Sequence, residues 1–150
     1  MKLAEALQER ADLNKNIDQL RIRLNNNAVV QENEEPAENP EELLKELDSA
    51  IKRLEELMER INRTNTMTVS AGKSLTALIA HRDSLKLKIS AYKDLVNSAS
   101  QIGRRVRMSE IRILSAVNVK DIQKQVDLLC KELRLTENQI QSLNWSVELL

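Results

Sequence analysis

Apolar residues recur along this chain at alternating spacings of three and four, which places them on one stripe of a helix. Four stretches carry this pattern, and we expect a helix over each of them: residues 2–24, 40–61, 75–103 and 119–145. The periodicity predicts a mainly α protein, an antiparallel bundle of about four long amphipathic helices. A chain of 150 residues suits one compact unit, so we expect a single helical domain over residues 1–150.

The four predicted stripes consist almost wholly of apolar side chains. In chain order they are Leu3, Ala6, Leu13, Ile17, Leu20, Leu24; Leu44, Leu47, Ile51, Leu54, Met58, Ile61; Leu75, Leu78, Leu85, Ile89, Tyr92, Val96, Ala99; and Val119, Ile122, Val126, Leu129, Leu133, Ile140. The second helix has the clearest start, because Asn39 can cap free amides and Pro40 suits the first helical position. Ser74 and Asn118 are the expected caps of the third and fourth helices.

Between these stretches the helical period is lost. Residues 25–39 are polar and contain four glutamates around Pro36, so they predict a loop. Residues 62–73 are rich in Asn, Thr and Ser, which hydrogen-bond their own backbone, so we expect a connection there. In residues 104–117, Val106 alternates with Met108 and Ile111 with Ile113, which is the period of a short β-ribbon.

Composition and charge narrow the function classes. Two glycines, two prolines and 1% aromatic residues favour long helices over sandwiches or barrels. Lys plus Arg and Asp plus Glu both number 23, so the chain has no net field that would attract nucleic acid or an anionic membrane. Charged residues interrupt every apolar run well before the roughly 20 residues that a membrane-spanning helix requires.

Reactive residues are scarce. The single cysteine, Cys130, and single histidine are too few for a Cys/His zinc site, and we expect neither a metal nor a cofactor. The chain has no phosphate-loop glycines, nucleophile elbow or dinucleotide fingerprint, so it is not expected to be an enzyme. The N-terminal residues lack the apolar core of a secretory signal, which leads us to expect a cytoplasmic protein.

Two arginines, Arg10 and Arg82, occupy stripe positions where a bundle normally has apolar side chains. The favoured interpretation is structural: each pairs with a glutamate of a neighbouring helix or extends to solvent. The alternative is a small anionic ligand or a nucleotide, held between guanidinium groups that suit carboxylate or phosphate. Asn62, Arg63 and Asn65 are further candidates for such a site, although helix capping and loop closure explain them more simply.

The only dense basic stretch contains Arg104, Arg105, Arg107 and Arg112. On an extended ribbon, alternate members would share one face. The favoured interpretation is a charged edge strand that resists aggregation, and nucleic-acid binding is the minor alternative.

Apolar residues close the chain: Trp145, Val147, Leu149 and Leu150. An exposed cluster of this kind is typical of a protein interface. We therefore expect these residues to anchor a contact between copies of the chain, which makes a homo-oligomer the favoured assembly.

Several strings together resemble a family of short, uncharacterised bacterial proteins often named septicolysin. They are residues 2–7 (KLAEAL), 23–27 (RLNNN), 36–38 (PAE), 61–65 (INRTN), 124–127 (KQVD) and 144–145 (NW). The resemblance covers nearly the whole chain and carries no active-site residues. The family name implies a membrane-active cytolysin, whereas the charged helices and the missing export signal point away from a toxin. The favoured hypothesis is a non-enzymatic, self-associating cytoplasmic protein; the alternatives are an anionic-ligand or nucleotide-binding module and the cytolysin.

Overall fold

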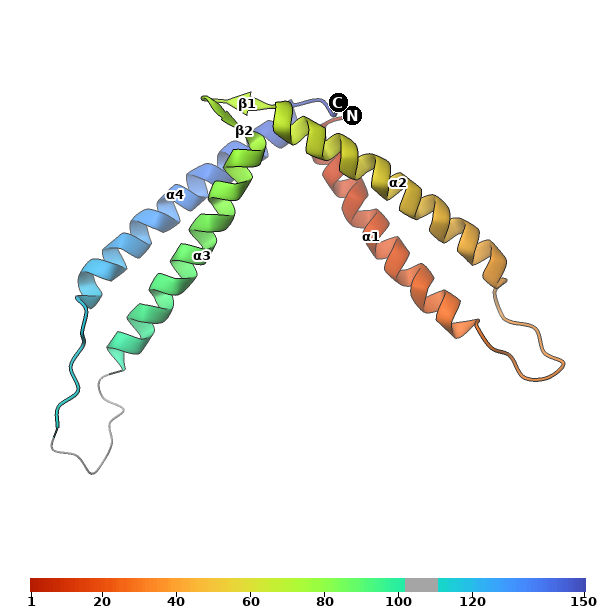
Figure 1. Ribbon diagram of the computed structural model, residues 1–150, viewed down its shortest axis with the longest axis horizontal. Coiled ribbons are helices and arrows are strands. Elements are labelled where there is room, and N and C mark those ends of the chain that lie inside the picture. The colour runs from red at the N-terminus through yellow and green to blue at the C-terminus, as the bar shows by residue number, and fades with distance from the viewer. Residues whose placement is uncertain (102–110) are drawn as a thin grey trace. The chain divides into compact units, whose positions relative to one another are not determined.

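The computed structural model describes residues 1–101 and 111–150. This part of the chain is mainly helical, as the periodicity predicted. Figure 1 shows its elements in chain order: α1 (Leu3–Asn26), α2 (Pro40–Met67), β1 (Val69–Ser70), β2 (Lys73–Ser74), α3 (Leu75–Ser100) and α4 (Val119–Ser146). The prediction of four long helices over the described residues is confirmed.

The chain divides into two compact units. The first contains residues Met1–Ser74 together with Leu143–Leu150, and the second contains Leu75–Ser142. The expectation of a single domain over residues 1–150 stays a prediction. Each unit has a core of its own, which is described separately below.

In the first unit, α1 and α2 lie side by side and run antiparallel (Figure 1). The side chains that pack between them are fully buried or nearly so: Leu3, Ala6 and Leu20 from α1, and Leu43, Leu57 and Ile61 from α2. Half of the predicted α2 stripe is buried, since Ile61 is buried and Leu47 and Leu54 are half-buried, and the other half is wrong by one position. The structure buries Leu43, Ala50 and Leu57, whereas the predicted Leu44, Ile51 and Met58 stay 48%, 46% and 46% exposed.

Both ends of α2 are determined by side chains that bond to the backbone. At the start, the Asn39 side chain accepts a hydrogen bond from the Glu41 N–H at 3.0 Å, as the sequence predicted. At the other end, residues 62–67 are helical and not part of a connection. The hydroxyls of Thr64 and Thr66 donate to the carbonyls four residues earlier, at 2.8 and 2.9 Å, so these threonines satisfy their polar groups inside the helix.

A two-residue hairpin follows α2. β1 and β2 pair antiparallel, with Val69 opposite Ser74 and Ser70 opposite Lys73. The turn residues Ala71 and Gly72 have φ values of 49° and 78°, and positive φ at both central positions is the signature of a type I′ turn. Gly72 adopts this conformation without strain, whereas Ala71 carries a Cβ and pays a steric cost.

The second unit is built on α3 and α4, which also lie side by side (Figure 1). Leu78, Leu85 and Ile89 of α3 are buried, as are Val126 and Ile140 of α4. Every residue of the two predicted stripes is buried or half-buried, so the sequence placed these faces correctly. Polar pairs border the core: His81 Nε2 lies 2.9 Å from Glu132 and Lys86 Nζ 3.2 Å from Glu137.

The predicted β-ribbon at residues 104–117 has no support in the described part of that segment. Residues 111–117 contain no strand. Residues 104–110 lie outside the described residues. The polar loop predicted at residues 25–39 is present, although α1 extends through Asn26.

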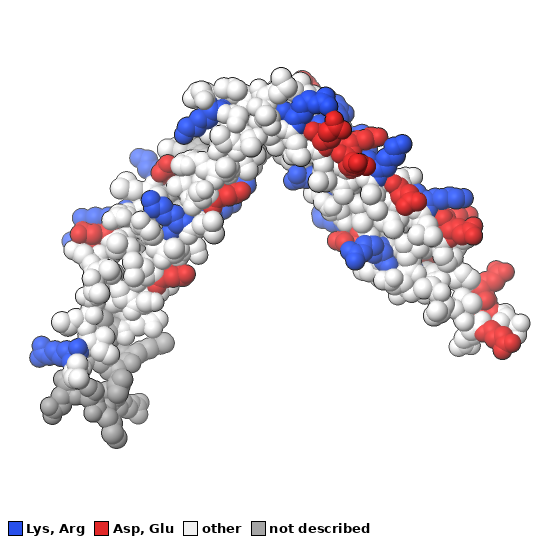
Figure 2. Space-filling view, viewed as in Figure 1, with Lys and Arg blue, Asp and Glu red and all other residues white. Residues whose placement is uncertain are grey.

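Charges of both signs are mixed along the helices. Figure 2 shows Lys and Arg next to Asp and Glu over α2, while acidic side chains gather on the loop that joins α1 to α2. Along the described helices, this face therefore mixes charges of both signs. The pattern agrees with the equal numbers of acidic and basic residues in the sequence.

Candidate functional site

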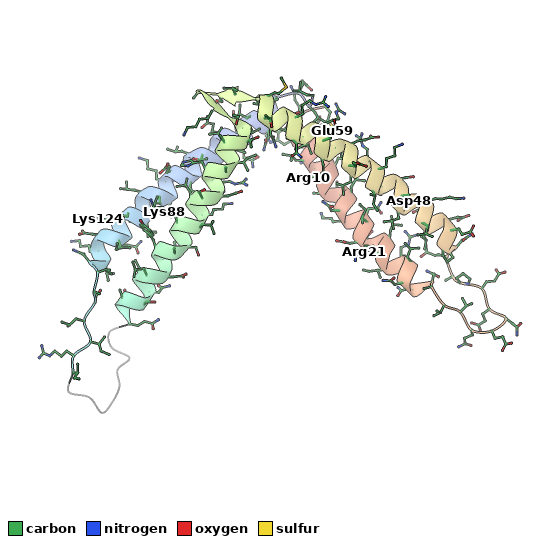
Figure 3. The ribbon with its side chains drawn as sticks, in the orientation of Figure 1. Arg10, Arg21, Asp48, Glu59, Lys88 and Lys124 are labelled. Atoms are coloured by element: carbon green, nitrogen blue, oxygen red, sulfur yellow. The ribbon has the colours of Figure 1, made fainter. Side chains whose placement is uncertain are left out.

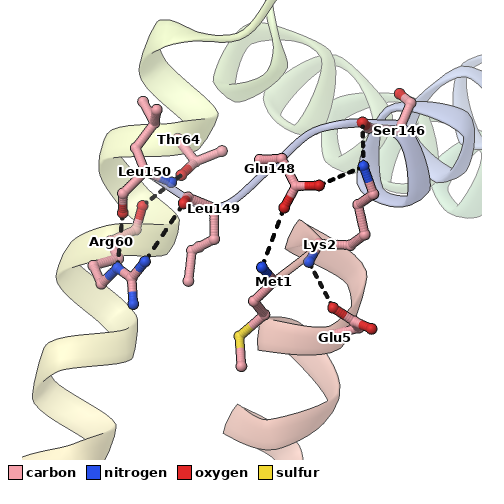
Figure 4. Close-up of polar contacts among 9 residues, drawn as sticks. All are labelled: Met1, Lys2, Glu5, Arg60, Thr64, Ser146, Glu148, Leu149 and Leu150. Carbon is pink, nitrogen blue, oxygen red and sulfur yellow. Dashed lines mark hydrogen bonds and ion pairs between the residues drawn. The ribbon is translucent and has the colours of Figure 1, made fainter.

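The ends of the chain form a polar cluster within the first unit (Figure 4). Residues 147–149 run beside residues 1–3: the Leu3 N–H donates to the Val147 carbonyl at 3.0 Å, and the Leu149 N–H donates to the Met1 carbonyl at 2.9 Å. On the other side, Thr64 Oγ1 accepts the Leu150 N–H at 3.0 Å. We call residues 147–150 the C-terminal tail.

Charged groups hold the C-terminal tail at both helices. Arg60 Nε donates to the Leu150 carbonyl at 2.8 Å, so α2 contributes a cation to the contacts that hold the tail. Glu148 accepts from Lys2 Nζ at 2.6 Å and from the Met1 amino group at 3.1 Å. These hydrogen bonds, from Lys2 and then from Met1, hold the pKa of Glu148 below its usual value.

This arrangement changes the role of the predicted terminal interface residues. Leu149 is 7% exposed, because it packs into the chain's own core. Val147 is half-buried and joined to α1 through its backbone. Trp145 and Leu150 remain 56% and 48% exposed, so only these two present apolar surface to solvent.

Two bidentate or near-bidentate ion pairs join α1 to α2 and to the loop between them. Arg53 of α2 donates to both carboxylate oxygens of Glu9, at 2.7 and 3.0 Å, and Arg23 of α1 pairs with Glu38 of the loop. The hydrogen bonds from these arginines lower the pKa of Glu9 and of Glu38. Both carboxyls are thereby held in the ionised form, which suits a structural role.

The two arginines that interrupt the stripes differ in their surroundings. Arg10 lies on α1 in the first unit (Figure 3), is half-buried, and has no hydrogen bond or ion pair with any described residue. Arg82 lies on α3 in the second unit and pairs with its neighbour Asp83 at 2.7 Å. It lines a polar hollow of about 320 Å³ with four residues of α4: Glu137, Asn138, Ile140 and Gln141.

The other ligand candidates lie on the last turns of α2. Asn62 and Arg63 are exposed, and Arg63 Nη2 donates to Glu59 at 2.8 Å within the same helix. Asn65 is half-buried. Arg63 therefore has a carboxylate partner on its own helix, and its role in an anion site stays a prediction.

The basic stretch is only partly described. Arg112 is exposed on a segment without regular structure, and Arg104, Arg105 and Arg107 lie outside the described residues. Among the residues that are described, no three His, Cys, Asp or Glu side chains come together to hold a metal ion. The described helices also include none that is long and apolar enough to cross a membrane.

Sequence reasoning missed the most distinctive surface of the first unit. Leu44, Ile51 and Met58 of α2 recur every seven residues and are all nearly half exposed. We call these three residues the apolar flank. The pattern in the sequence included these three residues, but it placed them in the same stripe as residues that the structure buries or half-buries.

Comparison with known proteins identifies the family. The model of DUF6847, a family of unknown function, matches residues 10–149. The chain belongs to DUF6847. The comparison with curated proteins gives no match.

A solved structure is similar to this DUF6847 protein along its whole length. It is the crystal structure of a functionally unknown conserved protein from Corynebacterium diphtheriae, 40% identical in sequence, with a TM-score of 0.93. The match covers 100% of this chain and 99% of that one. The family and this similar structure establish the fold of the DUF6847 chain without assigning an activity.

Proposed function

We propose that this DUF6847 protein is a non-enzymatic, cytoplasmic protein that self-associates through its helices. The observation that carries the proposal is its large exposed surface of 11108 Å² for a mass of 17.2 kDa. A compact monomer of this mass exposes about 7,800 Å², and two wholly separate compact bodies of half the mass expose about 9,400 Å² together. Because the second value treats the units as separate bodies, their relative placement does not account for the excess.

The excess is about twice the area that one standard subunit contact buries on each partner. The chain exposes about 1,700 Å² more than two separate compact bodies, and a standard protein interface buries about 800 Å² on each partner. Part of this surface is apolar, since large aliphatic side chains such as Leu44, Leu128 and Leu135 are 48%, 68% and 55% exposed. Burying such side chains in an assembly is favourable by about 25 cal/mol per Å² of apolar area.

The electrostatics favour a binding protein over an enzyme. Among the described residues, the acids with shifted pKa values are Glu9, Glu38 and Glu148, and all three have lowered values and lie in ion pairs with cationic groups. An acid held ionised in this way is a poor proton donor, and none of the three lines a closed cavity. Cys130 is a free thiol, which suits a reducing compartment such as the cytoplasm.

The oligomeric state tests the proposal. We expect native mass spectrometry and sedimentation of the full chain to give one defined oligomer that dissociates on dilution and carries no added mass. A monomer at every protein concentration tested would contradict self-association. Dye release from liposomes would instead support the cytolysin that the family resemblance implies.

The polar hollow beside Arg82 favours a second candidate function, the binding of a small anion. Arg82 shares this hollow with two amides, Asn138 and Gln141, which can donate hydrogen bonds to a carboxylate or phosphate. In that case native mass spectrometry would show a reproducible extra mass, and Arg82→Met would remove it. The pairing of Arg82 with Asp83 makes this the weaker candidate, because a bound anion must compete with a carboxylate.

A further inference from the structure

We propose that the apolar flank of α2, formed by Leu44, Ile51 and Met58, packs against the apolar flank of a second copy of this chain. This inference rests on the proposed self-association and names the surface through which it occurs. It follows from the position of the flank on α2, from the polar contacts on the opposite edge, and from the symmetry of the flank itself.

The flank lies beside the core face and not within it. Each of its residues follows a buried residue by one position, and one step along a helix rotates a side chain by about 100°. Thus Ile51 follows Ala50 and Met58 follows Leu57, whose exposed fractions are 8% and 0%. The core face and the flank together form an apolar arc that is too wide for α1 alone to cover.

The opposite edge of α2 is already closed by polar contacts. Arg53 and Arg60 follow Ala50 and Leu57 by three positions, which rotates them about 60° from the core face in the other direction. Arg53 pairs with Glu9 at 2.7 Å, and Arg60 binds the carbonyl of Leu150 in the C-terminal tail at 2.8 Å. The apolar flank is therefore the edge of this helix pair that still needs a partner.

The spacing of the flank suits a second copy of itself. Three residues seven apart are symmetric about the middle one, so an antiparallel two-fold pairing places Ile51 against Ile51 of the partner. The same pairing places Leu44 of each copy against Met58 of the other. Such an interface is isologous, with one surface used twice, and large apolar side chains meet along its whole length.

The charges that border the flank fit the same pairing. Asp48 (Figure 3), Lys52 and Glu55 are exposed on α2, and none of them has an ion pair or hydrogen bond with any described residue. In an antiparallel pairing centred on Ile51, Lys52 of each copy lies opposite position 50 of the other. That position is between Asp48 and Glu55, so each lysine meets two acids across the interface.

The surface area available on α2 is consistent with contact with a second copy of the chain. One interface of standard size requires about 800 Å² from each partner, and a helix of 28 residues is about 42 Å long. A face of this length, together with the adjoining side of α1, supplies that area. The surface excess of about 1,700 Å² leaves room for one such contact.

Two variants test the contact. Ile51→Lys places two ammonium groups at the two-fold axis, and we expect it to weaken association at least tenfold. Leu87→Lys is the matched control, because Leu87 is an even more exposed leucine on α3, at 75%, and the residues seven positions away are the small Ala80 and the charged Asp94. Circular dichroism checks that both variants keep their helices.

A cysteine variant keeps the test decisive if the lysine variant folds poorly. In a Cys130→Ser background, Ile51→Cys brings two thiols together at the two-fold axis, so mild oxidation should yield a covalent dimer. Glu59→Cys in the same background is the control and should not cross-link, because an antiparallel pairing centred on Ile51 separates the two copies of position 59 by about 24 Å along the helices.

The outcomes separate this inference from the proposed function. A covalent dimer from Ile51→Cys and weakened association of Ile51→Lys support both. An oligomeric wild-type protein whose assembly is unchanged by Ile51→Lys, with no cross-link at position 51, overturns the flank contact and leaves self-association standing. A monomeric wild-type protein overturns both proposals and leaves the flank to a different partner.

Discussion

The buried hydroxyl of Thr64 is expected to fasten the C-terminal tail to α2. Thr64 is fully buried, and its Oγ1 both donates to the Arg60 carbonyl at 2.8 Å and accepts from the Leu150 N–H at 3.0 Å. Thr64→Val keeps the shape of the side chain and removes both bonds. The helix is otherwise unchanged, so the substitution isolates the contribution of the hydroxyl.

The magnitude follows from the two bonds. A hydrogen bond contributes about 0.5–1.5 kcal/mol net, and leaving a partner unsatisfied adds to the loss. The exposed Leu150 lets water reach its N–H, and the Arg60 carbonyl keeps its place in the helix ladder. We therefore expect Thr64→Val to lower the free energy of unfolding by about 1–2 kcal/mol.

Thr66→Val is the matched control for this measurement. Thr66 makes the same bond to the carbonyl four residues earlier, at 2.9 Å, but it is exposed and does not contact the tail. Its replacement should change stability by less than about 0.5 kcal/mol. Urea unfolding gives both values, and hydrogen exchange of the Leu150 amide should accelerate only in Thr64→Val. Equal losses in the two variants, with unchanged exchange at Leu150, would refute this account of the tail.

Three further results are expected. Asn39→Ala removes the side-chain cap of α2 and should cost about 1 kcal/mol in urea unfolding. Ala71→Asn should stabilise the hairpin by about 0.5–1 kcal/mol, because Asn adopts a positive φ more readily than Ala, and no change would contradict the type I′ turn. The pKa of Glu9 is lowered by Arg53, so the folded carboxyl ionises more readily than the unfolded one. The Glu9–Arg53 ion pair therefore stabilises the fold above the pKa that Glu9 has in the unfolded chain, and this stabilisation is lost as the pH falls through the pKa of Glu9 in the folded protein. The difference in stability between wild type and Arg53→Met should disappear in acid.

Local patterns were sufficient for the elements whose signals are local. The caps Asn39 and Asn118 each accept a backbone N–H within three residues, so a short window of sequence determines them. The stripes of α3 and α4 were also predicted correctly, although other apolar residues such as Ile79, Leu95 and Leu128 lie next to them in sequence. The extension of α2 past Ile61 was missed because Asn and Thr residues favour turns on average, while Thr64 and Thr66 bond back into the helix here.

The candidate surfaces depend on contacts that no local pattern contains. Arg60 and Leu150 are 90 residues apart in sequence, and the two ends of the chain are further apart still. The contacts between them are therefore visible only in the fold. The sequence did not predict the hairpin, because a type I′ turn is normally recognised from Asn-Gly or Asp-Gly and here Ala71 takes the first position with positive φ.

The one-residue error at Leu44, Ile51 and Met58 in the predicted α2 stripe has a physical cause that bears on function. Leu43 and Leu44 are both leucines, so a seven-residue repeat can be drawn through either, and the sequence alone does not say which repeat faces α1. The structure assigns α1 to the repeat through Leu43 and leaves the repeat through Leu44 nearly half exposed. A helix with two adjacent apolar repeats has two packing faces, and a two-helix unit supplies a partner for one of them. The repeat that the sequence made most prominent is therefore the one that we propose for contact with a second copy of the chain.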